Sequence, residues 1–131
     1  MATPVLDQPV LRTGQPTTAA RDATRGFLQR AAQVRAPIRP GHADDVLLIV
    51  AELVTNALRH TDGPCVLHLE LHGDHLEVCV TDASPCPPQP RTPHTDGSGG
   101  WGWLLINHLA TRVTIELTSD GGKTICADAP W

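Results

Sequence analysis

The stretch Asp44–Thr61, which reads DDVLLIVAELVTNALRHT, limits the fold of this chain more than any other. It has the length and apolar spacing of one helix, and it holds more apolar residues than a single buried face needs, so we expect it to be nearly buried. Glu52, Asn56 and His60 nevertheless recur along it at intervals of four residues. Four residues turn a helix only ~40° past one full turn, so these side chains form one slowly turning stripe.

The two polar residues in the middle of this helix need partners. An unpaired polar group in an apolar environment costs about 2–7 kcal/mol. Glu52 and Asn56 therefore either hydrogen-bond to neighbouring backbone, as polar residues of a core helix do, or line a cavity that admits a ligand. The helix alone leaves both alternatives open.

The composition of the whole chain is that of one soluble globular domain. It has 131 residues, of which 40% are hydrophobic and 18% charged, enough for a single core. The net charge is −4 and no basic run occurs, so nucleic acid is a poor candidate for a partner. No apolar stretch is long enough to span a membrane and no signal-like segment opens the chain. We therefore expect a cytoplasmic protein without a membrane partner.

Neither the cysteines nor the histidines form a recognisable metal motif. Three of the four cysteines stand in apolar, strand-like sequence, where a thiol usually fills space; a disulfide or a zinc site is the less favoured interpretation. His68, His72 and His75 come close together, but only two of them fit one strand and no clear fourth ligand is nearby. We expect solvent-facing side chains on a hairpin. The cysteines are Cys65, Cys79, Cys86 and Cys126.

The first part of the chain predicts a tail followed by a helix. Residues 1–16 contain three prolines and no hydrophobic period, which indicates a flexible N-terminal tail. Thr17 or Thr18 is expected to cap a helix that runs to about Val34. The segment Ala36–Gly41 then separates this helix from the long one, and residues 17–131 are expected to form a single domain.

The rest of the chain predicts two hairpins with a loop and a helix between them. Cys65–Leu71 and His75–Thr81 alternate around a short turn, as in a hairpin with one buried face. Ala83–Gly100 is rich in proline and then glycine, as in a loop that is a lid or is disordered. A helix over Trp101–Ala110 and a hairpin of Val113–Leu117 with Thr124–Ala127 follow. This order predicts an α+β fold: a two-layer α/β sandwich with one mixed sheet and helices on one face.

The loop also carries chemistry. Asp82 ends the second strand at the mouth of the loop, and GSGGWG (Gly97–Gly102) then leads directly into a helix. Glycines let the backbone approach a phosphate, and a helix N-terminus offers free N–H groups and positive potential. The glycine run by itself is weak evidence, because it matches neither the GxxxxGK[ST] phosphate loop nor a parallel βαβ unit.

Four segments of the chain follow one another in an order found in a known family. They are ELVTNALRH (Glu52–His60), VTDASP (Val80–Pro85), GGWGWLLINHLA (Gly99–Ala110) and GGKT (Gly121–Thr124). They resemble the N box, the adenine-contacting box, the second glycine box and the final threonine strand of the GHKL superfamily of ATP-binding domains. The likeness covers about residues 17–128 and is greatest for the bacterial anti-sigma-factor serine/threonine kinases. It implies the Bergerat-type ATP-binding fold.

The resemblance implies roles for the matching residues. Asn56 would ligate a Mg²⁺ ion that bridges the phosphates of ATP, and Glu52 would be the general base for phosphoryl transfer. Asp82 would accept a hydrogen bond from the adenine amino group, with Thr124 in support. Residues Pro85–Ser98 would be a short lid. The nucleotide-binding residues of the glycine box would be Gly97, Gly99, Gly100, Trp101 and Gly102, of which Gly100 and Gly102 would present N–H groups to phosphates.

The resemblance also implies a function. The chain would be an ATP- and magnesium-dependent protein serine/threonine kinase that regulates transcription by switching partners. Its partners would be a sigma factor, an anti-anti-sigma protein of the STAS type, or both, and a homodimer stays open. Ala83, Ser84 and Pro85 stand where the adenine box of the family usually continues with glycines. The alternative is therefore a catalytically silent module that keeps the ATP-binding fold and regulates by docking a protein partner.

Overall fold

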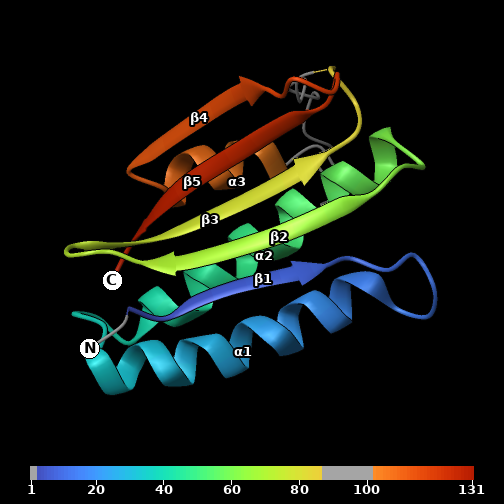
Figure 1. Ribbon diagram of the computed structural model, residues 1–131. Helices are drawn as coiled ribbons and strands as arrows, with labels where there is room; N and C mark the ends of the chain where they lie inside the picture. The colour runs from blue at the N-terminus through green and yellow to red at the C-terminus, as the bar shows by residue number, and fades with distance from the viewer. Residues whose placement is uncertain (1–2, 87–101) are drawn as a thin grey trace, which may run out of the picture.

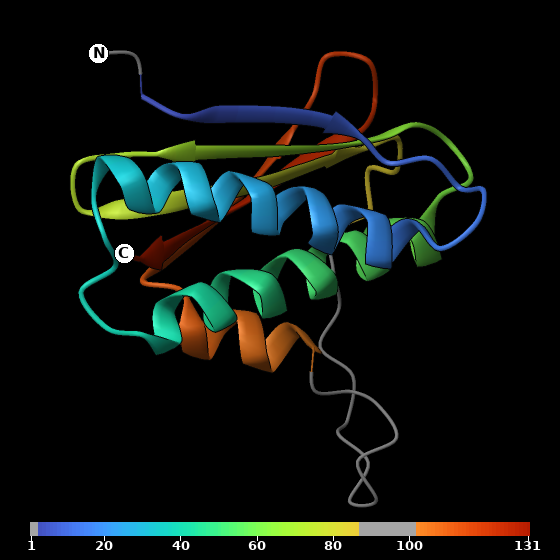
Figure 2. The same cartoon turned by 90° about the horizontal axis from the view of Figure 1, so that it is seen from below.

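The computed structural model describes residues 3–86 and 102–131, and within them the chain forms three helices and five strands in two layers (Figure 1). The helices lie together on one side of the sheet (Figure 2). In chain order the elements are β1 (Val5–Pro9), α1 (Pro16–Val34), α2 (Gly41–His60), β2 (Cys65–Leu71), β3 (His75–Asp82), α3 (Gly102–Leu109), β4 (Arg112–Leu117) and β5 (Lys123–Pro130).

The strands form one sheet in the order β1-β2-β3-β5-β4, and each neighbouring pair is antiparallel. The predicted α+β sandwich with helices on one face is confirmed, but the predicted mixed sheet is wrong. The connection through α3 makes β4 run parallel to β3, and β5 lies between these two strands. The two parallel strands therefore never pair with each other. Within the described residues, no helix is long and apolar enough to cross a lipid bilayer.

The N-terminal segment is not a loose tail. Val5–Pro9 pairs with β2 from Val5 opposite Glu70 to Pro9 opposite Val66. Farther along, the Arg12 guanidinium donates hydrogen bonds to the carbonyls of Leu58 at 3.2 Å and Gly63 at 3.3 Å, and also to that of Thr61. These bonds satisfy carbonyls at the C-terminal end of α2. The predicted flexible tail is therefore wrong for these residues. An edge strand is held by backbone hydrogen bonds, so it can form without a hydrophobic period in its sequence.

The first helix begins earlier than a threonine cap would allow. Pro16 occupies the first turn of α1, and the N-cap is Gln15, which makes no side-chain capping bond. Thr17 and Thr18 therefore lie inside the helix, and the predicted threonine cap is wrong. Proline suits this position because its missing N–H would have no partner there in any case. The predicted end of the helix at Val34 is confirmed.

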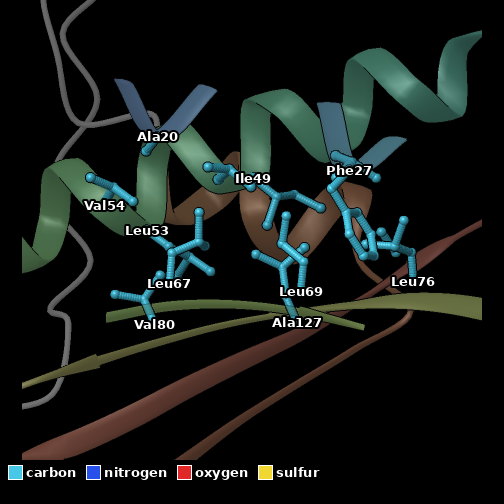
Figure 3. Packing of buried hydrophobic residues seen from close by; sticks show 14 of the residues in the cluster. Ala20, Phe27, Ile49, Leu53, Val54, Leu67, Leu69, Leu76, Val80 and Ala127 are labelled. Atoms are coloured by element: carbon cyan, nitrogen blue, oxygen red, sulfur yellow. The ribbon is translucent and has the colours of Figure 1, made fainter. Parts of the chain in front are cut away.

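The core lies between the sheet and the helices α1 and α2 (Figure 3). The predicted inner face of the first hairpin is confirmed, since Leu67 and Leu69 of β2 are fully buried. They meet Ile49 and Leu53 of α2, and Phe27 of α1 fills the adjoining space. Alternate residues of each strand supply this packing, so the remaining alternate residues point to the other face of the sheet.

A disulfide joins Cys79 of β3 to Cys126 of β5 on the face that carries no helix. The two residues are register partners with Cα atoms 4.1 Å apart. The expectation that these two thiols merely fill space is therefore wrong. The bond could not be predicted from the sequence, since 47 residues separate the two cysteines and only the strand register brings them together. Cys65, which is buried, and Cys86, which is exposed, remain free thiols.

Candidate functional site

The polar stripe of α2 reaches the beginning of α3. The two helices pack together, and Glu52 lies directly against Gly102, the first residue of α3. A Cβ atom at residue 102 would collide with Oε2 of Glu52 and come within 3.0 Å of its Cδ. Glycine permits this approach, and a larger residue would require the Glu52 side chain to move. The structure thus brings the predicted Glu52 and Gly102 together, although 50 residues of sequence separate them.

Asn56 lies one turn farther along α2 and has a polar atom without a partner. Its side chain is half-buried, and its Nδ2 atom is buried with no hydrogen bond to any residue that the structure describes. Such an atom costs about 1–3 kcal/mol when it stays unsatisfied. A carboxamide in this state suits a polar ligand, and its oxygen is a hard ligand of the kind that Mg²⁺ accepts. The donor set therefore fits a magnesium-bound phosphate.

Asp82 ends β3 on the helix-covered side of the sheet, and it already has a partner. The side chain of Lys123, the first residue of β5, is fully buried, and its Nζ atom lies 3.0 and 2.9 Å from the two carboxylate oxygens of Asp82. The backbone N–H of Ser84 donates to the same carboxylate at 2.8 Å, and Nζ also donates to the Ser84 carbonyl at 3.2 Å. This ion pair uses most of the acceptor capacity of Asp82.

The approach of β5 to the end of β3 depends on a second glycine. A Cβ atom at Gly122 would collide with the carbonyl oxygen of Asp82 and lie 3.1 Å from its carbonyl carbon. The backbone of the turn before β5 therefore rests directly on that of Asp82. This contact delivers the Lys123 side chain to the Asp82 carboxylate.

The structure does not bring Thr124 to Asp82. The register places Thr124 opposite Thr81, and their hydroxyl oxygens are 2.8 Å apart. Both residues alternate with the buried ones of their strands and so belong to the face without helices. Lys123 takes the place expected for Thr124. Lys123 alternates in the sequence with Ile125, Ala127 and Ala129, which are buried. This alternation could have predicted its burial, but the predicted strand began at Thr124 and left Lys123 out.

A free cysteine completes the surroundings of Asp82. Cys65 begins β2 and is the register partner of Asp82. Burial raises the pKa of the Cys65 thiol to about 11, and the negative charge of Asp82 adds to the shift. Cys65 is therefore a neutral thiol near pH 7 and a poor nucleophile.

Several predicted residues fall outside the part of the chain that the structure describes. They are Gly97, Gly99, Gly100 and Trp101, together with residues 87–98 of the expected lid. Of the nucleotide-binding residues expected in the glycine box, only Gly102 is described. His60, the last member of the polar stripe, is exposed at the end of α2 and takes no part in the site.

Comparison with known proteins defines the class. Residues 15–128 match the family model of the histidine kinase-like ATPase domain. The match covers most of the 131 residues, so the chain belongs to this family, and the expected membership in the GHKL superfamily is confirmed. The family implies nucleotide binding, which agrees with the polar stripe of α2 facing the start of α3.

The fold also occurs in a solved structure of two bacterial protein domains. The RsbU and RsbW domains of Rv1364c from Mycobacterium tuberculosis superpose with a TM-score of 0.69 at 20% sequence identity. The match covers 98% of this chain and 32% of that chain, so this chain spans about a third of the larger protein. At this identity the likeness shows the fold alone. No curated protein sequence matches the chain.

Proposed function

We propose that this chain binds ATP with Mg²⁺ beside the start of α3 and transfers the γ-phosphoryl group to a serine or threonine hydroxyl of a partner protein. One observation carries the proposal: α2 holds the Glu52 carboxylate directly against Gly102, the first residue of α3. A carboxylate at this place borders the helix N-terminus that attracts phosphate. Membership in the ATPase family supports the same site.

Each residue of the site has a distinct task in this proposal. Glu52 accepts the proton of the attacking hydroxyl while the new oxygen–phosphorus bond forms and the bond to the leaving ADP oxygen breaks. The free N–H groups at the start of α3 hold phosphate oxygens. Asn56 holds the ion through its amide oxygen. When bound, Mg²⁺ neutralises the charge of the phosphates and so favours the transfer.

The proposed partners are those of an anti-sigma kinase. The chain would sequester a sigma factor, phosphorylate an anti-anti-sigma protein of the STAS type, and thereby regulate transcription in the cytoplasm. The fold shared with the RsbW domain is consistent with this proposal. A homodimer is a further partner to be tested by the molecular mass of the protein in solution.

The ion pair between Asp82 and Lys123 favours a second candidate function. An adenine amino group would need an acceptor on Asp82, and Lys123 and the Ser84 N–H already occupy that carboxylate. A chain that does not recognise the base would keep the fold and act by docking a partner without turnover. The two candidates differ in whether phosphate appears on the partner.

Calorimetric titration and a transfer assay test the proposal together. We expect Asn56→Ala to abolish magnesium-dependent ATP binding, and Glu52→Ala to keep binding while the rate of transfer from radiolabelled ATP falls by about 10²–10⁴-fold. Asn107→Ala is the matched control, since this exposed asparagine on α3 bonds only the Trp103 carbonyl. Unchanged ATP affinity in Asn56→Ala would contradict the site. ATP binding without a phosphoprotein would favour the docking module.

A further inference from the structure

A second polar cluster lies on the open face of the sheet, which is turned toward the viewer in Figure 1. His68 and Glu70 come from β2 and Glu77 comes from β3, each at an alternate position that the core does not use. His72 follows β2 directly. The proposed nucleotide site lies on the covered side, so this cluster is separate from it.

The polar atoms of the cluster converge. One ligand atom each of His68, Glu70 and Glu77 lies within 4.8 Å of the other two. The Nε2 atom of His72 is 2.9 Å from Oε2 of Glu70 and 3.6 Å from Oε1 of Glu77. The Nε2 atom of His68 is 3.8 Å from Oε1 of Glu70. The ligand atoms of His68, Glu70 and Glu77 therefore share one small space, and the Nε2 atom of His72 lies beside its two carboxylates.

Two of these groups repel each other. Glu70 and Glu77 are direct register partners on neighbouring strands, an arrangement in which like charges are destabilising. Among the described residues, only histidines lie within ion-pair distance of either carboxylate. A cation between the two carboxylates would remove the repulsion.

The two histidines are arranged as metal ligands usually are. Nδ1 of His68 is 2.7 Å from the Asp7 carboxylate of β1, and a proton shared there leaves the lone pair of Nε2 directed at the cluster. The Nε2 atom of His72 is buried and makes no hydrogen bond to a described residue, so its 2.9 Å contact with Glu70 lacks hydrogen-bond geometry. Both nitrogens are thus available to an acceptor of electron pairs.

We propose that His68, Glu70, His72 and Glu77 bind a divalent transition-metal ion, with Zn²⁺ as the best match. Imidazole and carboxylate ligands at ~2.0–2.2 Å in a tetrahedron lie about 3.3–3.6 Å apart. The separations from His72 to Glu70, from His72 to Glu77 and from His68 to Glu70 are 2.9, 3.6 and 3.8 Å, within reach of that geometry after small side-chain shifts. Asp7 is the outer partner that orients His68. The neighbouring group of Glu77, Cys79 and Cys126 is not available, because its two sulfur atoms are bonded to each other.

The experiment titrates the nucleotide-free, chelator-treated full chain with ZnCl₂ in a calorimeter. We expect one ion per chain, with affinity reduced at least tenfold in His68→Asn and in Glu77→Gln. Asp7→Asn, which leaves all four ligands in place, should weaken binding about 10–100-fold. His108→Asn is the matched control, because this exposed histidine lies on α3 in the other layer. Circular dichroism confirms that each variant is folded.

A cobalt titration separates the cluster from the free thiols Cys65 and Cys86. Bound Co²⁺ should absorb without a thiolate charge-transfer band, because the proposed ligands are nitrogen and oxygen. Absence of stoichiometric binding, equal zinc affinity in His68→Asn and the unmodified chain, or a strong thiolate band would each overturn the proposal. None of these results depends on ATP, so the proposed kinase function is tested separately.

Discussion

On the covered face of the sheet, Asp82 is 4% exposed and Lys123 is fully buried, and their charged groups touch. On the open face, Glu70 and Glu77 lie opposite each other with about a third of each side chain exposed, at 32% and 30%. Where water is excluded, a charge needs a dedicated partner of opposite sign. Where water screens the charges, two carboxylates can stand together and leave a place for an exchangeable proton or metal ion.

The largest expected effect comes from breaking the buried pair. Lys123→Met leaves the Asp82 carboxylate buried without its cation, and we expect the free energy of unfolding to fall by about 3–5 kcal/mol in urea denaturation. Arg25→Met is the matched control, because it breaks an exposed pair with Asp22 on α1 that should contribute less than about 1 kcal/mol. Equal losses in the two variants would remove the contrast between buried and exposed charges.

The next effect tests the open face through its disulfide. Replacing Cys79 and Cys126 with alanine frees a loop that spans 47 residues, and we expect a loss of about 2–4 kcal/mol in the free energy of unfolding. Addition of a reductant to the unmodified chain should lower stability similarly. Cys86→Ala, which changes an exposed free thiol, should alter it by less than about 0.5 kcal/mol. A reductant without effect would show that the bond contributes nothing to stability.

The smallest effect should have the opposite sign. Glu77→Gln removes one of the two facing carboxylates, so in metal-free buffer we expect stability to rise by up to about 1 kcal/mol. Glu116→Gln is the control on the same face, because Glu116 of β4 faces Thr124 and should change little. With Zn²⁺ present, the unmodified chain should be more stable than Glu77→Gln, since the variant lacks one of the proposed zinc ligands. A Glu77→Gln variant that is less stable without metal would contradict the proposed repulsion.

The local parts of the site were readable in the sequence. The stripe of Glu52 and Asn56 follows from helical spacing alone, and the inner face of β2 follows from alternation around Leu67 and Leu69. Gly102 was expected beside the phosphates, and the structure adds its close contact with Glu52. These features depend on residues close in sequence or on motifs in a known order.

The missed parts depend on register. Thr124 was expected beside Asp82, but the register of β3 and β5 pairs Asp82 with Lys123 and places Thr124 on the other face of the sheet. The strand Val5–Pro9 was not predicted, because an edge strand whose inner residues are only half-buried carries no strong hydrophobic signal. The pairing of Cys79 with Cys126 is likewise a property of two strands and not of either one.

By itself, the sequence determined the type and order of most helices and strands, the helix that forms the floor of the proposed ATP site, and membership in a family of ATPase domains. These follow from periodicity and short motifs, which act over a few residues. Only the tertiary structure decided that Lys123 neutralises Asp82, that β1 forms one edge of the sheet, and that His68, Glu70 and Glu77 meet on its open face. Pairing between strands that are distant in the sequence sets these contacts, and the periodicity of a single segment does not reveal which strands pair or in which register.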